Sequence, residues 1–165
     1  KEWFLDAPTL VVLGAGHVSL YLEKMAALLG FNIKVMDDRK ELANKERFSN
    51  ASEVICDSFD NLANYLEEKA YYVVVTREHK DDFKCVKTIL DHDSYSYLGM
   101  IGSRAKIAKT FDNLHQVGIT KAQTDTIFSP IGLNIGARTP AEIAVSITAQ
   151  MILERAKRTK TSGIS

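Results

Sequence analysis

Two glycines separated by one residue, Gly14 and Gly16, follow an apolar segment in the sequence "VVLGAGHVS". A glycine-rich turn between a strand and a helix leaves backbone N–H groups free to bind a phosphate. Ser19 stands where the third glycine of a G-x-G-x-x-G motif would be, and it is small enough to keep the packing. The pattern predicts a phosphate or nucleotide site, with an ordinary tight turn as the alternative. The predicted binding residues in this turn are Gly14, Ala15, Gly16, His17 and Val18.

Acidic residues end the next apolar segment, "NIKVMDD". Asp37 lies 23 residues after Gly14, near the interval of about 20 residues at which an acid binds a ribose in dinucleotide-binding folds. Asp37 and Asp38 favour the unphosphorylated ribose of NAD, whereas Arg39 could hold the 2′-phosphate of NADP. The two indications conflict, so the sequence leaves NAD and NADP both open. A solvated polar loop is the alternative for these three residues.

The segment "TREHKDD" follows the most strongly strand-like run of the chain. Thr76 would lie at the tip of that strand, and His79 could act as a general acid or base because its pKa is easily tuned. Asp82 comes three residues later and could orient His79. The same His/Asp spacing occurs in metal sites, but no third ligand is evident, so we expect no metal. A surface loop with a helix cap explains the segment equally well.

A second anion site is indicated by "GSRAK". Ser103 is a good helix N-cap, and Arg104 then falls in the first helical turn. A cation there opposes the helix dipole, so a bound phosphate or carboxylate would explain Arg104 better than stability does. A remote acidic partner for Arg104 is the alternative. The nearby loop "SPIGLNIGARTPAE" is unusually apolar and is expected to pack against the fold, a ligand or a partner, with Asn134 available as an amide donor.

These side chains must be positioned by alternating strands and helices. The spacing of apolar residues and turns predicts strands at 9–13, 32–37, 53–56, 71–76, 96–102 and 126–130, and helices at 17–29, about 59–69, about 81–90, about 103–117 and from residue 140 onward. Strands joined by helices form parallel sheets with right-handed crossovers. We therefore predict a single α/β domain with a doubly wound, mainly parallel, Rossmann-like sheet, whose ligands bind at the carboxyl ends of the strands.

Composition limits the class of protein. The 165 residues have a formal net charge of zero, which argues against binding nucleic acid through overall charge. No apolar run is long enough to span a membrane, and no signal peptide is visible. Cys56 and Cys85 have no metal-binding spacing and are both predicted to be small buried hydrophobic residues, which fits a reducing, cytoplasmic location. We expect residues 1–158 to form the domain and residues 159–165 to form a flexible tail.

Four segments occur in a distinctive order: "LGAGHVS", "VVVTREHKDD", "YLGMIGSRAK" and "PIGLNIGARTPAEIAVSI". Together they resemble the C-terminal Rossmann domain of the XdhC family, the xanthine dehydrogenase accessory proteins, over residues 9–154. Thr76, His79 and Asp82 match the family pattern, but Arg77 stands where members often have a histidine. The resemblance implies that one cleft is lined by Gly14, Gly16, His17, Asp38, Arg39, His79, Ser103 and Arg104.

The resemblance also implies a function. XdhC proteins are thought to bind molybdenum cofactor, a phosphate-bearing pterin, guard it during sulfuration and deliver it to the apoenzyme. The implied partners are a molybdenum hydroxylase apoenzyme and a sulfurase, and a homo-oligomer is compatible with this role. Family members usually carry an additional N-terminal domain that these residues do not include, so the chain is either a fragment or a stand-alone relative.

Three functions follow from these observations. The first is a cofactor-binding maturation factor rather than a catalyst, and we assign no catalytic residue. The second is an NAD(P)-dependent oxidoreductase, although 165 residues leave little room for a substrate domain. The third is a regulatory domain that senses a nucleotide, or a Rossmann domain that has lost its ligand, because a fold alone does not define a function.

Overall fold

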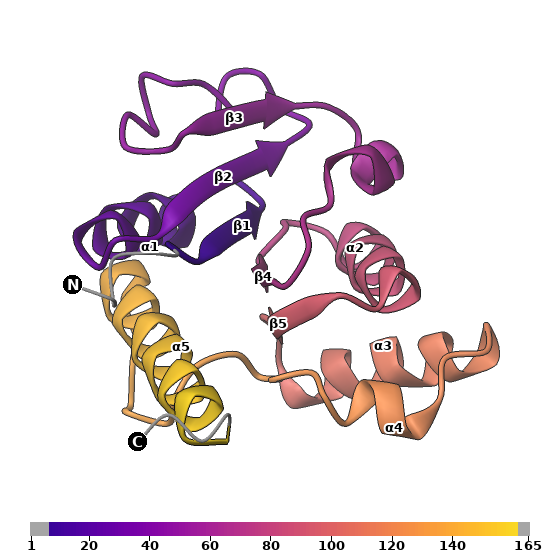
Figure 1. The fold of residues 1–165 in the computed structure, drawn as a ribbon. Helices are drawn as coiled ribbons and strands as arrows, with labels where there is room; N and C mark the ends of the chain where they lie inside the picture. The colour runs from indigo at the N-terminus through magenta and orange to yellow at the C-terminus, as the bar shows by residue number, and fades with distance from the viewer. Residues whose placement is uncertain (1–6, 162–165) are drawn as a thin grey trace.

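The computed structural model describes residues 7–161, which form one five-stranded sheet with helices on both faces (Figure 1). The strands are β1 (Thr9–Leu13), β2 (Asn32–Asp37), β3 (Glu53–Cys56), β4 (Ala70–Val74) and β5 (Tyr95–Met100). They are all parallel and lie in the order β3-β2-β1-β4-β5. This order reverses at β1, as in the Rossmann fold. The predicted doubly wound α/β domain is confirmed.

The connecting segments are mostly helical. The helices are α1 (His17–Leu28), the 3-10 helix η2 (Phe59–Tyr65), α2 (His79–His92), α3 (Arg104–Gln116), α4 (Lys121–Thr124) and α5 (Pro140–Thr161). The predicted capping box at the start of α5 is present: Glu142 N donates to Thr139 Oγ1 over 3.1 Å, and Thr139 N donates to Glu142 Oε1 over 3.1 Å. These reciprocal bonds satisfy backbone donors at the start of the helix.

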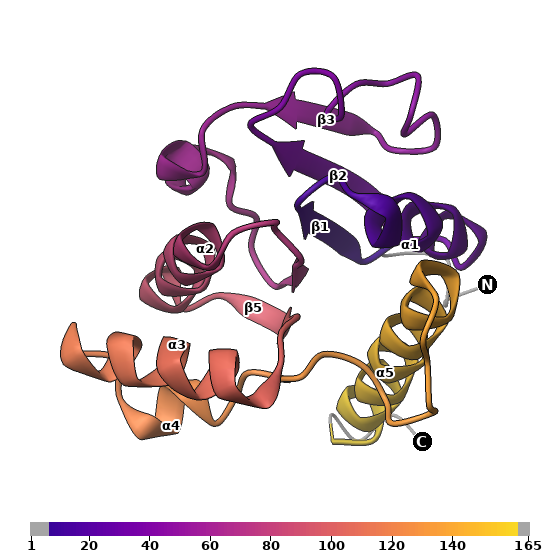
Figure 2. The same ribbon diagram turned by 180° about the vertical axis from the view of Figure 1, so that it is seen from behind.

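The sheet separates two apolar cores. Val11 and Leu13 of β1 pack on the face covered by η2, α2 and α3, whereas Leu10 and Val12 pack on the face covered by α1 and α5. Figure 2 shows from behind how α1 and α5 lie on one side of the sheet and α2 and α3 on the other. Because successive side chains of a strand point to opposite faces, a sheet covered on both faces needs apolar residues at odd and even positions alike. This explains the continuous apolar run of β1.

Two predicted elements differ from the structure. The helix expected at 59–69 is the short η2, and its C-cap Leu66 is already extended, with ψ of 147°. The strand expected at 126–130 is reduced to one bridge between Phe128 and Gly99 beside β5. Pro130 explains why the pairing does not continue as a strand, since proline has no backbone donor. The prediction for Cys85 is confirmed, because it is buried, but the prediction for Cys56 is wrong, because it is exposed.

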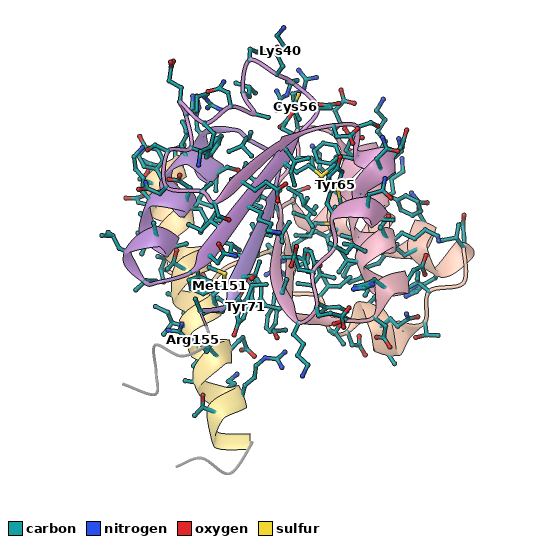
Figure 3. The ribbon with its side chains drawn as sticks, turned by 45° about the horizontal axis from the view of Figure 1, so that its top comes forward. Lys40, Cys56, Tyr65, Tyr71, Met151 and Arg155 are labelled. Carbon is teal, nitrogen blue, oxygen red and sulfur yellow. The ribbon has the colours of Figure 1, made fainter. Side chains whose placement is uncertain are left out.

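The exposure of Cys56 follows from its place in the sheet. It ends β3, which is an edge strand, and alternation directs the neighbouring Ile55 into the core instead. Figure 3 labels Cys56 and Lys40 near the carboxyl end of the sheet, far from Met151 on α5. Helix α5 continues through Thr161, and residues 162–165, the rest of the expected tail, lie outside the described residues. No helix between residues 7 and 161 has the length and apolarity to cross a membrane.

Candidate functional site

The turn after β1 is held tightly against the end of β4. Gly14 N donates to the Met36 carbonyl of β2 over 2.8 Å. Gly14 has φ of +114°, and a Cβ there would lie 2.4 Å from the Val75 carbonyl oxygen. Both the conformation and the contact require glycine at this position. The turn is therefore fixed by β2 on one side and by the segment after β4 on the other.

Ser19 explains how the turn tolerates the missing third glycine. Its side chain is fully buried, and its Oγ donates to the Gly14 carbonyl over 2.5 Å. The hydroxyl thus satisfies a carbonyl that the tight turn directs toward the helix. The substitution keeps the packing and adds a bond that glycine could not make.

The N-terminus of α1 is open. Its N-cap is Gly16, which has no side chain to cap the helix, and the first turn contains no acidic residue. No heavy atom lies within 4 Å of the position that a Cβ on Gly16 would take. His17 is exposed and Val18 is half-buried. Uncapped backbone N–H groups at a helix start, with space in front of them, are suited to bind an anion.

Asp37 connects this turn to β2. Its Oδ2 accepts from Ala15 N over 2.8 Å and from Arg39 Nη2 over 2.9 Å. Its Oδ1 accepts from Arg39 N and Arg39 Nε, each over 3.0 Å. Burial alone would raise the pKa of Asp37, but the bonds from Arg39 and Ala15 outweigh it and lower the pKa to about 2.

These four bonds fill the acceptor positions of the Asp37 carboxylate. Asp37 therefore shapes the turn from within the chain, and Arg39 is its ion-pair partner. The exposed neighbour Asp38 is the acid that remains accessible at the end of β2. Partial desolvation and the adjacent charge of Asp37 raise the pKa of Asp38.

Arg47 is a contributor that the local sequence pattern did not reveal. Its Nη1 donates to the Ala15 carbonyl over 2.7 Å and to the Leu42 carbonyl over 2.8 Å, and its guanidinium lies over the Phe48 ring at 5.2 Å. Arg47 thus fixes the turn to the loop after β2. Arg47 and Ala15 are 32 residues apart, so no short motif could have indicated the bond.

A pocket of about 300 Å³ opens beside Asp37, between the ends of β2 and β4 and the start of η2. We refer to it as the strand-end pocket. Its lining carries charges of both signs, including Asp38, Asp60 and Asp81 together with Arg39, Arg77 and Lys84. Carboxylates can accept hydroxyl or amino hydrogens of a ligand, and the cations can bind its phosphates.

Asp82 accepts hydrogen bonds from Thr76. The prediction that Asp82 orients His79 is therefore wrong. Thr76 N donates to Asp82 Oδ1 over 3.1 Å, and the Thr76 hydroxyl lies 2.5 Å from the same oxygen. This arrangement closes the loop after β4, which is the segment that contacts Gly14. His79 is exposed at the start of α2 and lines a groove between α2 and α3.

The protonation of Asp82 gives a testable pH dependence. Burial, only partly offset by the bonds from Thr76, raises the pKa of Asp82 from 3.8 to about 6. The folded state therefore binds the proton more tightly, so stability from this group is present below pH 4 and is lost as the pH rises through 6. The Asp82→Asn variant should lose this pH dependence, which amounts to a fall in unfolding free energy on the order of 2 kcal/mol between pH 4 and 8. The variant should be at least as stable as the parent at pH 8.

Urea unfolding of the parent and of Asp82→Asn, followed by circular dichroism between pH 4 and 8, measures the slope. The neighbouring Asp81→Asn variant is the control, because Asp81 is only half-buried. An unchanged slope in Asp82→Asn would show that another group titrates in this range.

The predicted helix start at Ser103 is confirmed, since its side chain accepts from Lys106 N over 3.3 Å. Arg104 is exposed and lines a separate hollow of about 450 Å³ with the loop 130–137, which includes Asn134. That loop is fixed to α5: Gly132 N donates to Gln150 Oε1 over 2.9 Å.

The predicted residues thus fall into three places. One connected arrangement lies at the ends of β1, β2 and β4, and it consists of the turn after β1 together with Asp37, Arg39 and Thr76. Arg104 lies on the hollow beside the loop 130–137, and His79 lies on the groove between α2 and α3. Among residues 7–161, no group of three or more His, Cys, Asp or Glu side chains is arranged to hold a metal ion.

Comparison with known proteins identifies a family that the chain matches. Residues 10–151 match the family model described as the XdhC Rossmann domain. The chain is 32% identical over 146 residues to the uncharacterized protein YqeB of Escherichia coli K12, covering 88% of this chain and 27% of that protein. It is 28% identical over 152 residues to a probable xanthine dehydrogenase subunit of Bacillus subtilis 168, covering 90% of this chain and 43% of that protein.

A solved structure agrees with these matches. The crystal structure of a xanthine dehydrogenase from Bacillus halodurans superposes with a TM-score of 0.79 at 29% identity, covering 93% of this chain and 44% of that chain. The chain therefore spans less than half the length of each of these relatives.

Proposed function

The chain belongs to the XdhC family, and on that premise we propose that it is the Rossmann domain of an accessory factor that matures a molybdenum hydroxylase of the xanthine dehydrogenase type. The names of two relatives, one in Bacillus subtilis and one in Bacillus halodurans, support an association with xanthine dehydrogenase. The partner we propose is the apoenzyme of such a hydroxylase. The role of the domain in this partnership is to hold an anionic ligand.

The single observation that carries ligand binding is the uncapped start of α1. Gly16 leaves space in front of the first-turn N–H groups, and no acidic residue in that turn competes for them. These groups fit a phosphate, which molybdenum cofactor and dinucleotides share. Asp38 in the strand-end pocket then accepts a hydroxyl or amino hydrogen from the rest of the ligand. In the bound state, molybdenum cofactor supplies the metal chemistry, and the chain supplies binding and orientation.

Replacing Gly16 with Leu tests this site. The larger side chain fills the space in front of α1, so we expect ligand affinity to fall at least about 30-fold, which corresponds to roughly 2 kcal/mol. Stability should change little, because Gly16 has φ of −84° and no heavy atom within 4 Å of the added Cβ. Isothermal titration calorimetry with molybdenum cofactor, NAD, NADH, NADP and NADPH measures the affinities.

Ala108→Leu is the matched control, since it adds a similar side chain at an exposed position of α3. Saturable binding of molybdenum cofactor that is lost in Gly16→Leu supports the proposal. Saturable binding of a dinucleotide instead would favour an oxidoreductase or a nucleotide sensor. Equal affinities for the parent and Gly16→Leu would show that the turn is only structural.

A further inference from the structure

A groove of about 750 Å³ lies between α2 and α3, on the face of the sheet opposite α1 and α5. We refer to it as the α2–α3 groove, and Figure 1 shows the two helices side by side. Phe83 and Val117 contribute apolar surface to it, and Val117 is 50% exposed. Lysines surround this surface: Lys80 and Lys84 on α2, and Lys106 and Lys109 on α3. An apolar surface bordered by charges of one sign is typical of a surface that binds a partner.

The charges of the groove are only partly compensated. Lys80 and Lys84 form ion pairs with Glu78 and Asp60, at 3.5 and 2.7 Å. Lys106 and Lys109 have no ion pair within 4.0 Å among the described residues. No carboxylate of the described chain lines the groove. The charge of Lys106 is partly offset at longer range by the buried carboxylate of Asp82. The chain therefore neutralises the positive charge of the groove only in part.

Stability does not explain the cations of α3. Lys106 and Lys109 are three residues apart on one helix, where like charges repel. Lys106 also lies in the first turn, which contains no acidic residue and where the helix dipole disfavours a cation. A negatively charged partner would remove both unfavourable terms. The positions of these cations thus favour an external anionic group.

The shape of the groove favours an elongated partner. The lining runs along α3 from Lys106 to Val117, roughly 16 Å at the rise of an α-helix. The lysines that line the groove come from two helices, Lys80 and Lys84 from α2 and Lys106 and Lys109 from α3. Asn113 and Gln116 add amides along the same side of the groove. A groove between two helices with these features is suited to bind a third, amphipathic helix.

We propose that the α2–α3 groove binds an acidic amphipathic helix of a partner protein. Apolar side chains of that helix pack on Phe83 and Val117, and its carboxylates pair with Lys106 and Lys109. The groove contains none of the residues of the turn after β1. It shares Lys80 and Lys84 with the strand-end pocket, but Lys106 and Lys109 line the groove and not that pocket. Changes at Lys106 and Lys109 therefore test the proposal separately from ligand binding at Gly16.

Fluorescence anisotropy with a labelled synthetic peptide tests the proposal on the full chain. The peptide has about 14 residues, roughly 21 Å as a helix, with leucines on one face and glutamates on the other. A second peptide has every glutamate replaced by glutamine. We expect saturable binding of the acidic peptide, and binding of the neutral peptide that is at least about tenfold weaker and less dependent on salt.

The decisive variant is Lys106→Glu/Lys109→Glu, which should weaken binding of the acidic peptide at least about tenfold. Lys24→Glu/Lys69→Glu is the matched control, because it makes the same change of net charge at two exposed positions outside the groove. Circular dichroism checks that both variants fold. Gly16→Leu should bind the peptide like the parent, whereas Lys106→Glu/Lys109→Glu should keep its affinity for the ligand of the turn.

Three results would overturn the proposal. The first is no saturable binding of the acidic peptide. The second is equal weakening by the groove variant and the control variant, which would show a general charge effect. The third is complete displacement of the peptide by inorganic pyrophosphate with loss of pyrophosphate binding in the groove variant, which would make the groove a small-anion site.

Discussion

The Gly14→Ala variant is expected to lose at least about 3 kcal/mol of unfolding free energy. Alanine would have to adopt φ of +114°, and its Cβ would lie 2.4 Å from the Val75 carbonyl oxygen. That oxygen cannot move away easily, because Val75 N donates to the Leu13 carbonyl over 2.9 Å and β4 pairs with β1. The contact is with backbone, so no change of rotamer relieves it. Urea unfolding at neutral pH measures the loss.

Two other glycines separate the causes of this loss. Gly30 has φ of +86° but no heavy atom within 4 Å of an added Cβ, so Gly30→Ala should cost only the backbone strain, about 1 kcal/mol. Gly16 has a negative φ and no heavy atom within 4 Å of an added Cβ. The unfolding free energy of Gly16→Ala should therefore be within about 0.5 kcal/mol of that of the parent. If Gly14→Ala costs no more than Gly30→Ala, the turn is not held against β4 as described.

The second large effect is expected for Asp37→Asn, at about 3 kcal/mol. The amide would keep one acceptor oxygen but would place an NH₂ group among donors from Ala15 and Arg39. It would also leave the Arg39 guanidinium without its ion-pair partner. The expected loss of stability therefore comes both from the missing acceptor oxygen and from the missing negative charge of Asp37.

The loss should depend on pH with a defined sign. The pKa of Asp37 is lowered from 3.8 to about 2 in the folded chain, so its contribution is present above pH 4 and disappears as the pH falls toward 2. The difference in unfolding free energy between parent and Asp37→Asn should shrink by about 2 kcal/mol over this range. Asp38→Asn, at the exposed neighbouring position, should change stability by less than about 0.5 kcal/mol. A difference that stays constant from pH 5 to 2 would contradict the assignment.

The local pattern of the sequence was sufficient to predict most of the strands and helices. Five strands and the main helices follow from apolar periodicity and from caps such as Ser103 and Thr139, whose partners are within a few residues. The pattern was insufficient at 59–69, where a short helix ends at Tyr65. It was also insufficient at 126–130, where only Phe128 pairs with the sheet. In both segments the distinction depends on which backbone groups find tertiary partners.

The candidate site was only partly predictable for the same reason. The spacing of Gly14 and Asp37 indicated their proximity, and the structure joins them through Ala15. Spacing could not show that Arg39 occupies the carboxylate of Asp37, because that depends on the conformation of the loop. It paired Asp82 with His79, which is near in sequence, although burial brings Asp82 to Thr76. Arg47 was missed because its acceptor lies across the fold.

The single bridge at Phe128 has a consequence for aggregation. It covers the outer edge of β5: Phe128 N donates to the Leu98 carbonyl over 2.8 Å, Met100 N donates to the Phe128 carbonyl over 3.0 Å, and Ile131 N donates to the Met100 carbonyl over 3.1 Å. An uncovered strand edge is a template for pairing with another molecule. The segment thus protects the chain from edge-to-edge association. Conditions that detach it, such as proteolytic cleavage between α4 and α5, would convert a monodisperse preparation into one that aggregates through β5.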